Sequence, residues 1–248
     1  MEFVFFEIIW GINAILGIIC GIKVFRAYQE TKSERIGDFA KFFLFYSSSL
    51  ILFTLYHLIL NLFFIKIFII FGLLCLFLSL AYINKLGFNF ISRKLALFVF
   101  WLTIIGNFLS FTSNLKYYLL APGRLTPMAL ALQTKDWLIF LWSFSALTIL
   151  IFCFLLGFCC GLYLIWQAIS TKEEKVKLKA FFFGGGLFLF GFGGVIRGMG
   201  EVLEGFILFG DFIFSLATFL FLLTLLFKIK EVPKVMVRKP IPSLPIKW

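Results

Sequence analysis

Long apolar segments alternate with short polar segments along the whole chain. Seven of the apolar segments hold roughly the 20 residues that a helix needs to cross about 30 Å of hydrocarbon. They cover residues 3–25, 42–62, 64–83, 95–114, 137–166, 180–197 and 205–227. Each is predicted to be a helix, because backbone groups in lipid must pair internally and the ten-residue alternation of barrel strands is missing. The pattern predicts an all-α polytopic membrane protein with a seven-transmembrane-helix bundle.

The composition leaves no room for a soluble domain beside these helices. Of the 248 residues, 62% are hydrophobic, and the mean hydropathy is +1.06. Residues 1–227 are therefore predicted to form one membrane bundle with short connections. Residues 228–248 form a basic tail with four prolines, which cannot hold a continuous helix.

The cations between the apolar segments fall mostly on alternate sides of the predicted bundle. The connections after the first, third and fifth segments and the tail carry 5, 3, 4 and 6 Lys or Arg residues, 18 in all. The opposite side carries 5. Because cations near helix ends are retained on the cytoplasmic side, the N-terminus is predicted to lie outside and the C-terminus in the cytoplasm. The net charge of +11 then reflects attraction to an anionic inner leaflet, and nucleic acid is not an expected partner.

Signals at the ends of the apolar segments refine this arrangement. Trp10 and Trp166 lie near predicted helix ends, where amphipathic rings favour the membrane interface. Residues 127–133 are predicted to form a short helix on the outer surface, because they follow a good cap and first-turn proline. Residues 170–174 carry a helix-start signal on the inner surface.

Polar side chains inside the apolar segments share helical faces. At 100° per residue, His57 and Asn61 share one face of the second segment, and Asn107 and Ser110 share one face of the fourth. Unpaired polar groups cost several kcal/mol in hydrocarbon, so such faces should turn towards one another or towards water. We predict an outward-opening polar cleft in which Arg197 is the cationic partner of the acidic residues. The candidate ligand-binding residues are Glu7, His57, Asn61, Asn107, Ser110, Arg197, Glu204, Asp211 and Ser215.

These polar residues also have a simpler interpretation as interhelical hydrogen-bond contacts, worth roughly 0.6 to 2 kcal/mol each. This alternative fits the Ser, Thr and Asn residues best. Asp211 lies well inside its predicted helix, where an ionisable group is costly and often functional. Glu7 and Glu204 lie close enough to the outer interface to be simply solvated.

The sixth apolar segment contains eight glycines between Gly184 and Gly200. Gly184 and Gly191 share one helical face, and Gly186 and Gly193 share nearly the opposite one. Neighbouring helices are therefore expected to approach this backbone closely on both sides. Tight static packing and a bending element are both compatible with the pattern.

Cofactor and enzyme chemistry has little support in the residues. The five cysteines all lie within apolar segments, so no disulfide is expected, and no Cys/His metal spacing occurs. His57 is the only histidine, which excludes a haem held by two histidines of this chain; a haem shared with another subunit stays open. The chain also lacks an H-E-x-x-H pair, a P-loop and a dinucleotide fingerprint. An enzyme is accordingly not expected.

The arrangement resembles two known families. Seven helices with an outside N-terminus are similar to the layout of microbial rhodopsins, and Asp211 precedes position 215 by four residues, as that family's carboxylate precedes its Schiff-base lysine. Position 215 is Ser215 here, so no covalent retinal can form. The layout also resembles the seven-helix sensory region of bacterial membrane histidine kinases. That resemblance implies a receptor in the prokaryotic cytoplasmic membrane, without the kinase part.

The favoured functional hypothesis is a receptor-like or sensory protein that binds a small ligand or ion from outside. It would signal through the inner connections and the tail, with a membrane or cytoplasmic protein as a candidate partner. Two alternatives are a small-solute or ion transporter and a non-catalytic subunit of a larger membrane complex. The inner halves of the last three segments are almost entirely apolar, which favours binding over transport.

Overall fold

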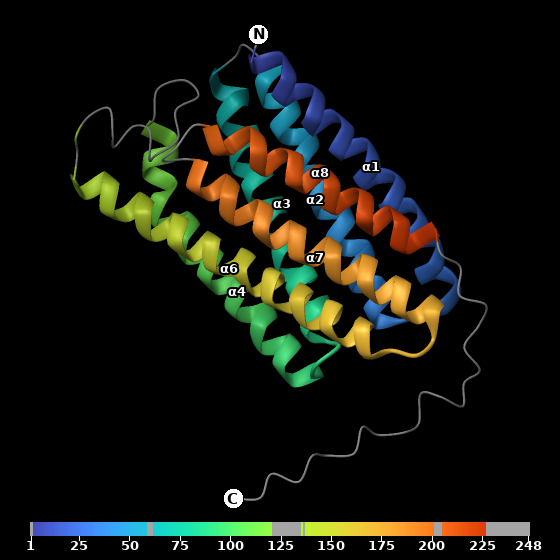
Figure 1. The fold of residues 1–248 in the computed structure, drawn as a ribbon. Coiled ribbons are helices and arrows are strands. Elements are labelled where there is room, and N and C mark those ends of the chain that lie inside the picture. Colours follow the sequence, from blue (N-terminus) through green and yellow to red (C-terminus); the bar gives the residue numbers. More distant parts are fainter. Residues whose placement is uncertain (1, 59–61, 121–134, 136, 201–204, 227–248) are drawn as a thin grey trace, which may run out of the picture.

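Figure 1 shows the fold of the chain in a computed structural model. The structure describes residues 2–58, 62–120, 135, 137–200 and 205–226. Side chains are described for residues 8–55, 64–109, 111–112, 135, 144, 147–197, 199, 206 and 208–226. The predicted helix over residues 127–133 and the predicted tail lie outside the described residues.

Seven α-helices account for nearly all of the described chain, and that part of the chain contains no strand. The fold class is therefore all-α. The helices are α1 (Glu2–Thr31), α2 (Glu34–Leu58), α3 (Leu62–Phe88), α4 (Arg93–Leu120), α6 (Trp137–Ser170), α7 (Glu174–Gly200) and α8 (Gly205–Leu226).

Six of these helices are long and apolar enough to cross a membrane, judged over the described residues. The segments are Ile8–Thr31, Glu34–Leu55, Phe64–Phe88, Leu147–Ser170, Glu174–Arg197 and Leu208–Leu226. The chain is thus a helical integral membrane bundle. Two helices extend beyond the apolar segments predicted from the sequence. α2 begins at Glu34 and α3 ends at Phe88. Charged side chains at these ends still adopt helical backbone geometry, so hydropathy alone began α2 too late and ended α3 too early.

The helices form a closed ring in which each packs against its neighbour in the sequence and α8 packs against α1. In Figure 1 the blue α1 and the red-orange α8 lie side by side, and α3 also contacts α6 across the ring. The short turns at residues 31–34, 88–93 and 170–174 share one end of the bundle (Figure 1), which we call the basic end. The start of α7 at Glu174 confirms the helix-start signal at that position.

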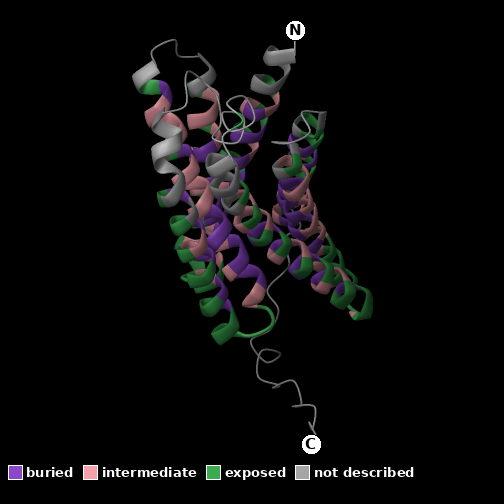
Figure 2. Ribbon diagram, turned by 90° about the vertical axis from the view of Figure 1, so that its left-hand side faces the viewer, coloured by how far each residue is buried: buried purple, intermediate pink, exposed green. Residues whose placement is uncertain are grey.

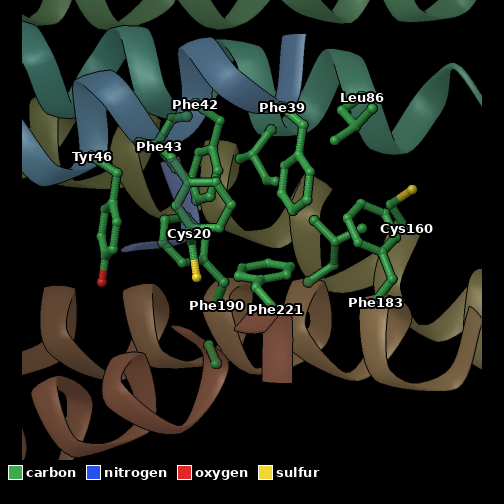
Figure 3. Packing of buried hydrophobic residues seen from close by; sticks show 14 of the residues in the cluster. Cys20, Phe39, Phe42, Phe43, Tyr46, Leu86, Cys160, Phe183, Phe190 and Phe221 are labelled. Carbon is green, nitrogen blue, oxygen red and sulfur yellow. The ribbon is translucent and has the colours of Figure 1, made fainter. Parts of the chain in front are cut away.

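Aromatic rings fill the centre of the bundle. Figure 3 shows Phe39, Phe42 and Phe43 of α2 facing Phe190 of α7 and Phe221 of α8. The ring centroids of Phe42 and Phe190 are 5.5 Å apart and the rings are nearly perpendicular, at 84°. Such edge-to-face contacts add roughly 0.5 to 1.5 kcal/mol to the burial of the rings. The rings make a continuous apolar core that reaches towards the basic end.

Both predicted glycine faces of α7 are confirmed. A Cβ on Gly191 would lie 2.6 Å from the carbonyl oxygen of Phe154 in α6, and one on Gly184 would lie 3.0 Å from the nitrogen of Ile165. On the other side, a Cβ on Gly186 would lie 2.7 Å from the Phe221 ring of α8. The glycines therefore allow α7 to be packed directly between α6 and α8.

Large apolar side chains cover the outside of the helices. Figure 2 shows buried residues along the sides of the helices that face one another and exposed residues along the outer sides. Ile15, Phe98 and Trp166 are 59%, 63% and 65% exposed. A soluble protein rarely exposes apolar surface this extensively, so the outer surface fits a lipid environment.

Candidate functional site

Asp211 of α8 is buried, and its carboxylate accepts hydrogen bonds from side chains of two other helices. Its Oδ1 atom accepts a hydrogen bond from Arg197 Nε of α7 at 2.7 Å. Its Oδ2 atom accepts one from the indole nitrogen of Trp10 in α1 at 2.8 Å. The Arg197 guanidinium also lies over the Trp10 ring, 5.2 Å from the centroid. This arrangement joins α1, α7 and α8 through one carboxylate.

A glycine next to Asp211 makes the ion pair possible. A Cβ on Gly210 would lie 2.8 Å from the backbone nitrogen of Arg197 and 2.7 Å from its Cβ. Without a side chain at position 210, the backbones of α7 and α8 approach closely enough for the guanidinium to reach Asp211. The side chain of Asp211 is 3% exposed and that of Arg197 is 33% exposed, so the anion is the more deeply buried partner.

The ion pair borders a small cavity of about 80 Å³, which we call the Asp211 cavity. Two of its lining side chains, Asn13 of α1 and Ser49 of α2, are 1% exposed. The Oδ1 atom of Asn13 and the Oγ atom of Ser49 have no hydrogen-bond partner among the described residues. The other lining residues are Trp10, Tyr46, Leu50, Phe53, Leu76, Leu147, Leu150, Phe154, Gly194, Arg197, Asp211 and Phe214.

The size of the Asp211 cavity limits what it can hold. A water molecule occupies about 30 Å³ in the liquid, so the cavity has room for about two waters or one small polar guest. Sites for drug-sized ligands are typically about 300 to 1,000 Å³. An uncompensated buried oxygen costs roughly 1 to 3 kcal/mol, so a guest that donates hydrogen bonds to Asn13 and Ser49 would be stabilising there.

The structure brings together two of the nine candidate ligand-binding residues, Arg197 and Asp211. The expected acid–base pairing of Arg197 is present, with Asp211 as the partner. Ser215 instead donates to the backbone oxygen of Asp211, 3.1 Å away within the same helix. Five further candidates lie outside the residues whose side chains are described. They are Glu7, His57, Asn61, Ser110 and Glu204.

Asn107 lies in a separate polar contact between α3, α4 and α6. Its Nδ2 atom is 3.5 Å from the Cys153 sulfur, and Asn84 Nδ2 donates to the Cys153 backbone oxygen at 3.0 Å. Thr103 accepts a longer bond from Asn84 at 3.4 Å. For Asn107 this geometry fits the interhelical-contact interpretation better than the cleft.

Three cavity residues escaped the sequence analysis. Trp10 was assigned only to the membrane interface, but it is 7% exposed and its indole nitrogen donates to Asp211, so its ring faces the bundle. Asn13 follows Trp10 by three residues, a spacing that places both on one face of α1. Ser49 follows Tyr46 by the same spacing on α2. A search for every polar residue within an apolar helix would have found Asn13 and Ser49.

A second ion-pair cluster lies at the basic end. Lys85 of α3 is 2.8 Å from Asp38 and 3.3 Å from Glu34, both in α2. Arg93 of α4 is 3.0 Å from Glu34. The sequence analysis counted Lys85 and Arg93 only as cations of a connection. In the structure they tie the ends of α2, α3 and α4 together.

Among the described residues, no group of three His, Cys, Asp or Glu side chains is placed to hold a metal ion. The five cysteines are free thiols, and Cys20, Cys153 and Cys160 are buried. No protein-family model, curated protein or solved structure matches this chain.

Proposed function

We propose that this protein is a receptor-like, sensory seven-helix membrane protein that binds a small ligand or ion in the Asp211 cavity. In this proposal α4, which is not among the six apolar spans named above, also crosses the membrane and brings the number of transmembrane helices to seven. The N-terminus lies outside, and the basic end with the tail lies in the cytoplasm. The cavity is then reached from the outer side, and the basic end carries the signal.

The observation that carries the proposal is the pair of unsatisfied buried oxygens beside an ion pair. Buried polar atoms in folded proteins are nearly always hydrogen-bonded, and exceptions call for a specific explanation such as a bound water or ion. Asn13 and Ser49 supply two such atoms in one cavity. Because the cavity also touches α7 and α8 through Arg197 and Asp211, a guest there contacts the helices that the ion pair joins.

The charges around the cavity define the chemistry of the guest. Both oxygens of Asp211 already accept hydrogen bonds, and Arg197 balances its charge. The unsatisfied atoms that remain include the carbonyl oxygen of Asn13, which only accepts. The guest is therefore a small cation, one that donates hydrogen bonds or that oxygen atoms coordinate.

The packing below the cavity favours binding over transport. Tyr46, Phe154 and Phe214 line the cavity and also belong to the aromatic core. From there the core continues to Phe39 and Phe183, whose ring centroids are 5.4 Å apart. A polar guest moving towards the basic end would have to separate these rings, at the cost of their packing.

A ligand screen on the purified full chain in detergent tests this proposal. Sodium, potassium, ammonium and methylammonium salts are added at matched ionic strength, and thermal unfolding is followed. We expect at least one cation to raise the Tm in a saturable manner, since a ligand at 100 times its Kd stabilises the folded state by about 2.7 kcal/mol.

The variant Asn13→Leu replaces the amide with an apolar group of the same heavy-atom number and branching, and Ser215→Ala is the control outside the cavity. The stabilising effect of the cation should disappear in Asn13→Leu and persist in Ser215→Ala. The proposal fails if no salt shifts the Tm, or if Asn13→Leu retains the full shift.

A further inference from the structure

A second and larger concave surface lies on the lipid-facing side of the bundle, between α1 and α2. This groove has a volume of about 940 Å³, more than ten times that of the Asp211 cavity. Its apolar walls include Ile22 and Phe25 of α1 and Leu44 and Ile51 of α2. These four side chains are between 38% and 61% exposed, so the groove opens towards the lipid rather than into the bundle.

Two glycines of α1 deepen the floor of the groove. Gly17 and Gly21 lie one turn apart, opposite Ser47 and Phe43 of α2. A Cβ on Gly21 would be 3.4 Å from the Cβ of Phe43, and one on Gly17 would be 2.5 Å from the hydroxyl oxygen of Ser47. The absence of side chains at both positions lets α2 pack closely against α1, and this contact forms the floor of the groove.

Ser47 lies in the floor of the groove. The residue is 5% exposed, and its hydroxyl is buried against Gly17 of α1, with no hydrogen-bond partner among the described residues. The hydroxyl therefore belongs to the contact between α1 and α2, and the surface that an occupant of the groove would meet is apolar.

The basic end of the groove carries excess positive charge. Its lining includes the cations Arg26, Lys32 and Lys41. Two carboxylates, Glu34 and Asp38, also line it, but both are engaged by Lys85. Lys32 and Lys41 lie over tyrosine rings, 5.8 and 5.2 Å from their centroids, and no ion pair to a described carboxylate holds Arg26, Lys32 or Lys41.

The apolar part of the groove has about the length of one leaflet of a bilayer. From Lys41 to Ile51 this part follows ten residues of α2, which is about 15 Å at 1.5 Å per residue. The hydrocarbon of a whole bilayer is roughly 30 Å thick. An occupant with an anionic group at the cations and a chain ending near Ile51 would therefore lie within a single leaflet.

We propose that the α1/α2 groove is a binding site for one anionic glycerophospholipid from the leaflet at the basic end. Arg26, Lys32 and Lys41 hold the headgroup, and an acyl chain lies along the exposed apolar walls described above. This site is independent of the Asp211 cavity, so either can fail its test without affecting the other.

Native mass spectrometry of the purified full chain in detergent measures this binding directly. The probes are phosphatidylglycerol and phosphatidylcholine with identical acyl chains. We expect one phosphatidylglycerol to bind per chain, several-fold more tightly than phosphatidylcholine, because a cation near an anionic lipid contributes about fivefold in affinity.

Two pairs of substitutions separate a built site from a diffuse surface charge. Arg26→Gln with Lys41→Gln removes two groove cations, and Lys23→Gln with Lys94→Gln removes two exposed cations outside the groove. Each pair lowers the net charge by the same amount. Phosphatidylglycerol affinity should fall at least about tenfold in the groove pair and less than about twofold in the control pair. Equal losses in the two pairs would overturn the proposal.

A variant of the apolar wall tests the groove without changing any charge. Leu44 is 61% exposed in that wall, so Leu44→Gln should weaken the binding of both lipids several-fold, while helix content and mass stay those of the parent chain. Undiminished lipid binding in this variant contradicts the proposal. So does a parent chain that has the mass of two copies and carries no lipid, since a second copy would then occupy the groove.

Discussion

The ion pair between Asp211 and Arg197 leads to an asymmetric prediction, because its two partners are buried to different extents. The side chain of Asp211 is 3% exposed and that of Arg197 is 33% exposed. Replacing Arg197 leaves a buried carboxylate with the indole of Trp10 as its described donor. Replacing Asp211 instead removes one partner of a guanidinium that is a third exposed.

The magnitudes follow from this difference. Removing one partner of a buried ion pair costs about 3 to 5 kcal/mol, and Arg197→Gln should fall in that range. Asp211→Asn should cost less, about 2 kcal/mol, because the amide oxygen can still accept from Trp10 and a hydrogen bond between neutral groups contributes about 1 kcal/mol. The double variant should cost less than the sum of the two, with a coupling of at least about 1 kcal/mol.

Reversible unfolding of the full chain in mixed micelles measures all three variants under one condition. Ser215→Ala serves as the control, because its hydroxyl bonds only to the backbone of its own helix in the described structure. An Asp211→Asn variant that is less stable than Arg197→Gln would refute the burial argument. A coupling near zero would show that the ion pair contributes nothing measurable to the fold.

Two further predictions concern packing elsewhere in the bundle. Asp38→Asn should destabilise the fold by about 3 kcal/mol, because Lys85 is 12% exposed and loses a carboxylate at 2.8 Å. Lys94→Gln, an exposed change at the same end, should cost under about 0.5 kcal/mol in the same unfolding assay. Equal costs of the two variants would contradict the reasoning. Gly191→Ala should cost at least about 2 kcal/mol, since its Cβ would lie 2.6 Å from an α6 carbonyl oxygen and overpacking typically costs about 1 to 3 kcal/mol. Gly11→Ala, with no atom within 4 Å of the new Cβ, should instead stabilise α1 by about 0.5 to 1 kcal/mol, and a loss at this position would argue against the packing assigned to α1.

Helix positions and the close glycine contacts of α7 were predictable from the residues alone. Hydropathy responds to runs of about twenty side chains, and the period of a helix places Gly184 and Gly191 on one face whatever packs there. The ends of α2 and α3 were less predictable. Glu34 of α2 and Lys85 of α3 both lie within helices and form an ion pair with each other, and a hydropathy window cannot detect such a partner.

The candidate site was predictable only in part. Asp211 is recognisable because an acid within an apolar helix is costly, and Arg197 is close to it in the sequence. Trp10 is not, since 201 residues separate it from Asp211 and its sequence context resembles that of an interfacial tryptophan. Asn107 shares a helical face with other polar residues, yet its neighbour is Cys153 of α6, because the rotation of α4 within the ring decides which helix that face meets.

The sequence by itself determined that this chain is a bundle of helices in lipid, since helix formation and solvent preference depend on local side chains and their period. The tertiary structure decided which helices are neighbours: α8 closes the ring against α1, and this places Trp10, Arg197 and Asp211 around one small cavity. It also decided that α1 and α2 leave a groove above Gly17 and Gly21. Both outcomes depend on how each helix is rotated and tilted against the next, and that is settled by the packing of all the helices together.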